Sequence, residues 1–267
     1  MKAKLITLLG GAVLLASASQ AAIVLMDQSF TLDGSDSPTI NGTAVGSANT
    51  AAGVASTWTA ATGTSGVLRT DGEIYGNVGN VSAFVGLGSL IDDSKNTPSG
   101  LFTLTATLSA PSGSNWTSVG FFTTGTIGEN FTGNTAAGVG TVLYRTTPAL
   151  DFFKGPDTGP GSISDITGVS GSQTVVVVLD LTSAGDTGAG DYGSVSFYRN
   201  SVSPANLEVT QDFDGAISID SVGISTAATT GALESITLTQ VPEPSTYAIW
   251  AGLMTLGLVL YRRRRIQ

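Results

Sequence analysis

Three aspartates in one glycine-rich stretch are the side chains whose types and spacing come nearest to a binding site. Asp180, Asp186 and Asp191 lie within twelve residues of each other. Carboxylate and carbonyl oxygens on such a loop are the ligands that Ca²⁺ prefers. The spacing differs from that of an EF-hand, and a solvated hairpin loop is the other interpretation. We therefore expect no cofactor, with calcium at these three aspartates as the alternative.

The chain contains no histidine and no cysteine. This excludes Ser-His-Asp and Cys-His catalysis and nearly every type of zinc site. A pair of carboxylates could still hydrolyse a glycosidic bond, but Glu73, Glu129, Glu208 and Glu234 are far apart in the sequence. We predict that the chain is not an enzyme, and a carboxylate-dependent glycan hydrolase is the alternative.

Five aromatic residues could offer flat faces to sugar rings: Trp58, Trp116, Tyr75, Tyr192 and Tyr198. Aromatic side chains within strands fill a core more often than they bind a ligand. We therefore expect Trp58 and Trp116 in the core.

The charge of the chain bears on its partners. Residues 23–240 carry 5 Lys and Arg against 19 Asp and Glu, a formal charge of −14. Nothing in this region could neutralise the phosphates of a nucleic acid, so we expect no nucleic-acid partner. The acidity suits solubility outside the cell.

The elements that must position these residues are predicted to be strands. In Leu101–Leu108, Phe102 and Leu104 alternate with threonines, which is typical of a strand with one buried face. Val175–Leu179 is a continuous apolar run, as in a strand covered on both faces. Further strands are expected at Ile23–Met26, Thr57–Ala60, Val67–Arg69, Ala83–Leu87, Thr117–Thr123, Thr141–Arg145, Asp151–Phe153, Ser194–Arg199, Ile217–Ile224 and Leu233–Thr239.

About a dozen strands joined by tight turns predict an all-β fold, an antiparallel β-sandwich. Two packed sheets would bury a common set of side chains: Phe102, Leu104, Phe121, Leu143, Val176, Val178, Phe197, Ile219 and Leu238. The stretches Thr174–Asp180 and Gly193–Asn200 resemble the second half of concanavalin-like and laminin-G-like jelly rolls, in which a long core strand ends in Asp and a strand ending in Tyr-x-Asn forms a hairpin at the edge. The resemblance implies a fold that often binds glycans, sometimes through calcium.

The C-terminal stretch has the three parts of a sorting tag. Pro242 and Pro244 keep the stretch after Val241 out of any strand or helix. The uncharged segment 247–261 would form a helix about 22 Å long, which is short for a membrane span of about 30 Å. Four arginines follow and favour retention on the cytoplasmic side. A buried helix with a solvated basic tail is the alternative.

This arrangement resembles the PEP-CTERM sorting signal of Gram-negative, biofilm-forming bacteria. The sorting motif comprises Val241, Pro242, Glu243, Pro244 and Ser245, and the membrane stop comprises Arg262, Arg263, Arg264 and Arg265. The resemblance implies processing by an exosortase in the inner membrane, then a cell-surface or extracellular destination often linked to exopolysaccharide.

The N-terminus agrees with export. Lys2 and Lys4 precede an apolar run and a zone of small residues, which is the pattern of a signal peptide. A cut after Ala21 or Ala22 is expected, and an uncut anchor is the alternative. The predicted organisation is a signal peptide at 1–22 with its helix, a β-sandwich at 23–240, and a sorting signal at 241–267 with a transmembrane helix at 247–261. The predicted role is adhesion or association with exopolysaccharide, and a purely structural matrix protein is a further alternative.

Overall fold

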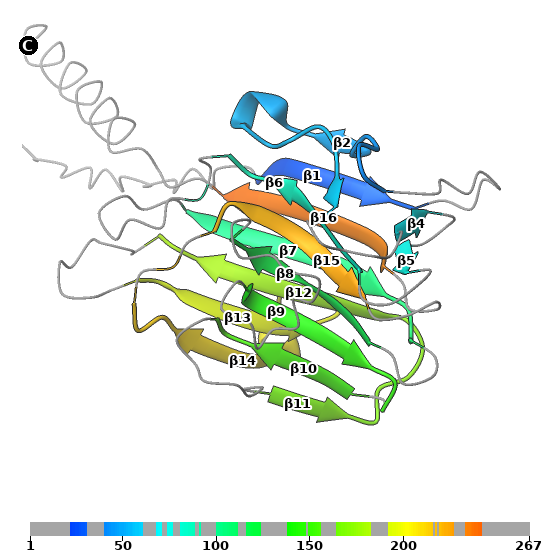
Figure 1. The fold of residues 1–267 in the computed structure, drawn as a ribbon. Helices are drawn as coiled ribbons and strands as arrows, with labels where there is room; N and C mark the ends of the chain where they lie inside the picture. The colour runs from blue at the N-terminus through cyan, green and yellow to red at the C-terminus, as the bar shows by residue number, and fades with distance from the viewer. Residues whose placement is uncertain are drawn as a thin grey trace, which may run out of the picture.

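Alternating apolar residues build two antiparallel sheets that pack face to face, as the computed structural model of the chain shows (Figure 1). The structure describes residues 22–30, 40–60, 68–70, 74–76, 81–88, 91, 100–111, 116–123, 138–147, 149–155, 164–182, 192–215, 217, 219–226 and 233–241. The prediction of an all-β fold with two antiparallel sheets is confirmed for this part of the chain. Residues 1–21 of the predicted signal peptide and the residues after Val241 lie outside it.

The first sheet has nine strands. From one edge the order is β14 (Leu207–Asp212), β13 (Ser194–Arg199), β12 (Gln173–Asp180), β7 (Leu101–Leu108), β16 (Leu233–Val241), β1 (Ile23–Ser29) and β2 (Ser47–Ala48), and β5 (Ile74–Gly76) pairs with both β16 and β4 (Leu68–Thr70).

The second sheet has seven strands. Their order is β11 (Ser164–Thr167), β10 (Ala149–Phe153), β9 (Gly138–Arg145), β8 (Trp116–Phe122), β15 (Ser221–Thr226), β6 (Val81–Gly86) and β3 (Thr59–Ala60). The described helices are two short 3₁₀ turns, η1 (Thr50–Ala52) and η3 (Pro204–Asn206). Within the described ranges, no helix is long and apolar enough to cross a bilayer.

The strand alternation predicted from the sequence places one side chain in two between the sheets. Phe102, Leu104 and Leu238 lie in this core, and Phe152 of β10 stacks on Phe197 of β13 with ring centroids 5.3 Å apart, joining the two sheets. The predicted strands Leu101–Leu108 and Ser194–Arg199 are confirmed with the same bounds. The strand expected at Ile217–Ile224 is found as β15, but it begins only at Ser221, and the buried Ile217 and Ile219 precede it.

The valine run of β12 is buried on both of its faces, as predicted. The core between the sheets takes Val175, Val177 and Leu179. Val176 and Val178 are buried as predicted, but on the opposite face of the sheet, beside half-buried threonines of β7, and not between the two sheets. Leu143 likewise lies on the outward face of the seven-stranded sheet.

The predicted hairpin between the stretch ending in Asp180 and the stretch containing Tyr198 is confirmed as β12 and β13. Its position at the sheet edge is wrong, because β14 pairs with β13 on the other side. β14 shows no clear alternation in burial, since an edge strand is exposed to solvent along much of its length.

Candidate functional site

The outward face of the seven-stranded sheet carries a row of small polar side chains. Ser82, Ser225 and Ser118 are cross-strand neighbours on β6, β15 and β8, and Ser82 Oγ donates to Ser225 Oγ at 2.8 Å. The buried Ser118 Oγ and Thr141 Oγ1 make no hydrogen bond within the described part of the chain. Buried hydroxyls without a partner cost about 1–3 kcal/mol each. The packing of the sheet therefore does not explain why this face is polar.

A buried aspartate continues this face at the hairpin of β9 and β10. In Leu150–Phe152 the two flanking apolar side chains enter the core, so Asp151 must point to the outward face. Asp151 is only 2% exposed and forms an ion pair with the half-exposed Arg145, from Nε to Oδ2. The β9–β10 register places these two residues diagonally opposite, within reach of a long side chain.

Trp116 completes the group, which we call the Arg145 corner: Trp116, Arg145 and Asp151. Trp116 begins β8 and is the Cα partner of Arg145 on β9. It is only half-buried and lies outside the core, so the prediction of a core position was wrong for Trp116 and correct for the buried Trp58. An indole offers a flat apolar face, a guanidinium offers up to five donors, and a carboxylate accepts.

The chain packs tightly below the Arg145 corner. Tyr144, the neighbour of Arg145, points into the core, and its hydroxyl donates to the carbonyl of Gly171 at 2.9 Å. Burial raises the pKa of the Tyr144 hydroxyl above its usual value. Gly171 precedes β12, so this hydrogen bond joins the two sheets at the end of the sandwich where the corner lies.

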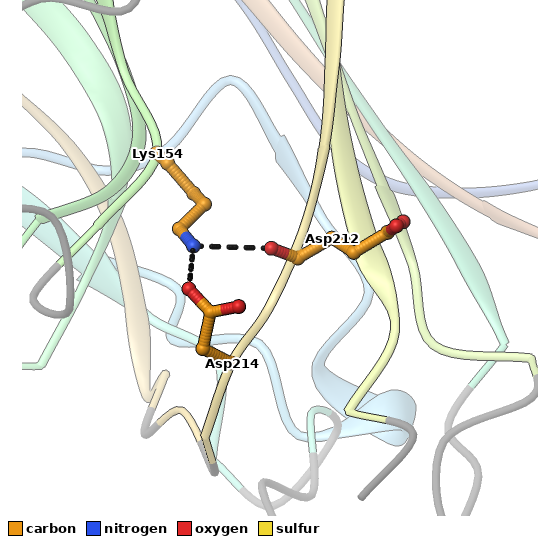
Figure 2. A network of polar contacts seen from close by, with 3 residues as sticks. All are labelled: Lys154, Asp212 and Asp214. Carbon is orange, nitrogen blue, oxygen red and sulfur yellow. Dashed lines mark hydrogen bonds and ion pairs between the residues drawn. The ribbon is translucent and has the colours of Figure 1, made fainter.

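The opposite end of β10 carries a second buried charge (Figure 2). Lys154 is 3% exposed, and its Nζ donates to Asp214 Oδ2 at 2.7 Å and to the backbone carbonyl of Asp212 at 3.1 Å. Asp214 lies just past the end of β14, so the contacts fasten the two sheets together. Lys154 and Asp214 are 60 residues apart in the sequence, so no local pattern predicts their contact. This arrangement is structural, since both donated bonds end within the protein.

The three aspartates predicted to hold calcium are only partly described. Asp186 and Asp191 lie outside the described residues. Asp180 ends β12, and its Oδ1 accepts from the backbone N–H of Thr182 at 3.0 Å and from Thr182 Oγ1 at 2.6 Å, which is an Asx-type turn. Among the residues that the structure describes, no three His, Cys, Asp or Glu side chains are grouped so as to hold a metal ion.

The glutamates considered for hydrolysis are held apart. Glu208 forms an ion pair with Arg199 on the neighbouring strand. Glu234 accepts from Ser109 Oγ at 2.5 Å and from Ser172 Oγ at 2.6 Å, which ties the starts of β12 and β16 together. Glu73 and Glu129 lie outside the described residues, as do Pro242–Ser245 and Arg262–Arg265. Val241 of the sorting motif is the last residue of β16.

The signal for the Arg145 corner was present in the sequence. A single Asp between Leu150 and Phe152, and an Arg ending an apolar strand six residues earlier, are charged residues inside runs that otherwise fill a core. The short Thr146–Pro148 connection predicts a hairpin that brings the two strands together. The charged pair could therefore have been found, but the exposure of Trp116 could not.

No known protein family matches the chain. No curated protein matches it either. Among solved structures, a protein of unknown function from Shewanella oneidensis MR-1 is similar over 72% of this chain and 80% of its own, at 13% identity and a TM-score of 0.42. The exoplasmic/lumenal domain of VIP36, in a Ca²⁺- and mannose-bound form, is similar over 71% and 85%, at 8% identity and a TM-score of 0.41. A Lotus tetragonolobus seed lectin is similar over 79% and 100%, at 12% identity and a TM-score of 0.42.

Proposed function

We propose that this chain is an exported, non-catalytic β-sandwich that binds carbohydrate at the cell surface through the Arg145 corner. The observation that carries the proposal is the grouping of Trp116, Arg145 and Asp151 on one outward face. The buried carboxylate holds the guanidinium in place while half of the Arg145 side chain stays exposed to solvent. A sugar ring could stack on the indole and accept hydrogen bonds from the guanidinium, the usual pairing of an apolar face with a few fixed polar groups.

The charge of the body restricts the sugar. With a formal charge of −14 over residues 23–240, the body repels polyanions at low ionic strength. Neutral hexose polymers therefore fit better than uronic-acid polymers. A neutral ligand also agrees with a guanidinium already neutralised by Asp151.

A matched pair of arginines tests the binding site. Arg145 and Arg199 have side chains 48% and 40% exposed, and each binds one carboxylate through Nε, but they lie on different sheets. In titrations of the 22–241 body with a panel of neutral exopolysaccharides, Arg145→Ala should weaken binding by about tenfold or more, equivalent to ~1.4 kcal/mol. Arg199→Ala should leave the affinity unchanged. Equal loss in both variants, or no binding to any polymer, would refute the assignment.

Catalysis and calcium are tested in the same titrations. Release of reducing ends from any of the polymers would replace binding by hydrolysis as the function. Calcium at Asp180, Asp186 and Asp191 would lie at the far end of β12 from the corner. Addition of EDTA should therefore leave the Arg145-dependent affinity unchanged, and a loss of affinity with EDTA would relocate the site to that loop.

Sorting to the surface is the second part of the proposal. It is supported by the order of Pro-Glu-Pro, apolar segment and arginines after Val241, and by the signal-peptide pattern before Ala22. An exosortase and the inner membrane would be the partners during export. The protein would then remain at the cell surface or in the extracellular matrix of a biofilm. The adhesive role depends on this location, since the polysaccharide is outside the cell.

A further inference from the structure

The first and last strands of the sandwich are neighbours. β1 and β16 run antiparallel, and Ile23 is the Cα partner of Gln240. The ladder of β16 continues for one more residue, Val241, which pairs with Leu101. Pro242 has no N–H to donate. The described body therefore begins and ends at one point on one edge of the molecule, which we call the tether end: the start of β1 and the end of β16.

The Arg145 corner lies at the other end of the sandwich. β12 runs from Gln173, next to the hydrogen bond between Tyr144 and Gly171, to Asp180, whose Cα partner on β7 is Leu101. Leu101 in turn pairs with Val241 at the tether end. The eight residues of β7 separate the two ends, a distance of about 27 Å at ~3.4 Å per residue.

The connection from the tether end to the apolar segment is short. Five residues, 242–246, lie between Val241 and the segment 247–261. Fully extended, they reach about 18 Å at most, which is less than the length of the sandwich. A body joined to the membrane through this connector cannot lie with the Arg145 corner against the lipid while β16 remains paired to its end.

The surface of the tether end agrees with a position near lipid. Ile23 and Val24 are among the few large apolar side chains that the described part of the chain exposes, at 41% and 51%. They lie beside the strand end from which the connector leaves. The carboxylates at this end include Asp180, Asp212 and Asp214, on or just after strands on the far side of β7, and Asp220, which precedes β15 of the other sheet.

We propose that the tether end is the face of the body that meets the inner-membrane bilayer before processing, so that the Arg145 corner is presented outward. The proposal rests on the membrane anchoring put forward above. The partner is the lipid surface, contacted through Ile23 and Val24 next to the two chain ends. Both processing sites, the signal-peptide junction and the sorting motif, are then reached at the same place on the membrane.

Two exposed valines provide a matched test. Val24 lies at the tether end and is 51% exposed; Val202, in the hairpin between β13 and β14 at the opposite end, is 55% exposed. The chain has no cysteine, so Val24→Cys and Val202→Cys each give one labelling site. The full chain with either label is reconstituted into phosphatidylethanolamine–phosphatidylglycerol vesicles that contain a headgroup-labelled acceptor lipid, and energy transfer is measured.

We expect transfer from position 24 to exceed transfer from position 202 at least twofold. A twenty-residue Gly/Ser insertion after Val241 should reduce this difference. Equal transfer, or greater transfer from position 202, in chains that float with the vesicles would overturn the orientation alone. Failure of the full chain to float with the vesicles would overturn the anchoring itself and the orientation with it.

Discussion

At the scale of single residues, three of the five basic side chains of the body form ion pairs within the part of the chain that the structure describes. Arg145, Lys154 and Arg199 each bind a carboxylate, Asp151, Asp214 and Glu208 respectively. In a body of formal charge −14 such pairs reduce repulsion among carboxylates. The three pairs differ in which partner is buried: the carboxylate in the first, the ammonium in the second, and neither fully in the third. We therefore expect the pairs with one fully buried partner to contribute more to the free energy of unfolding than the Arg199–Glu208 pair.

Removing the carboxylate of the Lys154–Asp214 pair should destabilise the protein, whereas removing the ammonium should not. Asp214→Ala leaves a buried ammonium that still donates to the carbonyl of Asp212. It should lower the free energy of unfolding by about 1 kcal/mol, less than is typical of a fully buried pair because Asp214 is 77% exposed. Lys154→Met removes the charge and keeps the apolar stem, so its stability should stay near wild type. Urea unfolding of the 22–241 body measures both.

The control for this pair is Asp27→Ala. Asp27 is an exposed carboxylate that accepts from Thr237 Oγ1 at 2.9 Å, and its removal should change stability by no more than about 0.5 kcal/mol. If Asp214→Ala behaved like Asp27→Ala, the contact shown in Figure 2 would have no role in joining the sheets.

Tyr144 predicts how stability responds to alkali. Its pKa is raised by burial, so the unfolded chain loses the proton more readily than the folded one. The contribution of Tyr144 is complete below the unfolded pKa of about 10 and is lost as pH rises from there through the folded pKa. Unfolding by urea at pH 8 and pH 10.5 should show a larger decrease for wild type than for Tyr144→Phe. An equal decrease would show that other groups cause it.

At the scale of elements, β9 must approach the other sheet closely. Gly140 adopts φ +59°, and a Cβ built on it would lie 2.7 Å from Val195 Cγ2 and 2.9 Å from Val177 Cγ1. Its N–H donates to the carbonyl of Lys154 at 2.8 Å, which holds β9 against the end of β10. A glycine is needed here for both reasons, since any side chain would enter the core from a conformation that L residues avoid.

Gly168 is the matched control for Gly140. It has φ +76° but no atom within 4 Å of an added Cβ. Gly168→Ala should cost only the left-handed backbone strain, about 1–2 kcal/mol, whereas Gly140→Ala should cost at least 2 kcal/mol more because the core is overpacked. Thermal unfolding of the two variants compares them directly, and equal losses would mean that the sheets can move apart at this point without cost.

The strands differ in how well the sequence predicts them. Long strands with one half-buried face, such as β7, can be predicted from the sequence because polar and apolar residues alternate strictly. The edge strand β14 and the two-residue strand β2 have no such pattern, and they join the sheet through backbone hydrogen bonds to the neighbouring strand. Apolar runs predict burial but not its direction, which is why Val176, Val178 and Leu143 were expected between the sheets.

The candidate site also contains residues that a local sequence pattern predicts and residues that it does not. The charges of Arg145 and Asp151 stand out within apolar strands, so their pairing could be predicted from the hairpin between them. The row of serines on the outward face could not, because it depends on the order β6, β15, β8, in which strands far apart in the sequence become neighbours. Long-range strand order is not encoded in local alternation.

At the scale of the whole molecule, the topology places binding and tethering at opposite ends. The first and last strands share one ladder at the tether end, and the β9–β10 hairpin carries the Arg145 corner at the other. The body should therefore fold without the residues on either side, because every ladder bond of β16 is complete by Val241. Removal of residues 242–267 should leave the midpoint of urea unfolding unchanged, and a large decrease would show that the tail is part of the fold.

The central claim is that this sandwich folds and works outside the cell after both of its ends have been processed. The intact mass of the protein recovered from the surface and medium of an exosortase-containing Gram-negative host tests it most directly. We predict a species that starts at Ala22 or Ile23 and lacks the apolar segment 247–261 and the four arginines. Recovery of the unprocessed chain, with residues 1–21 and 247–267 retained and confined to the cytosol, would contradict the account.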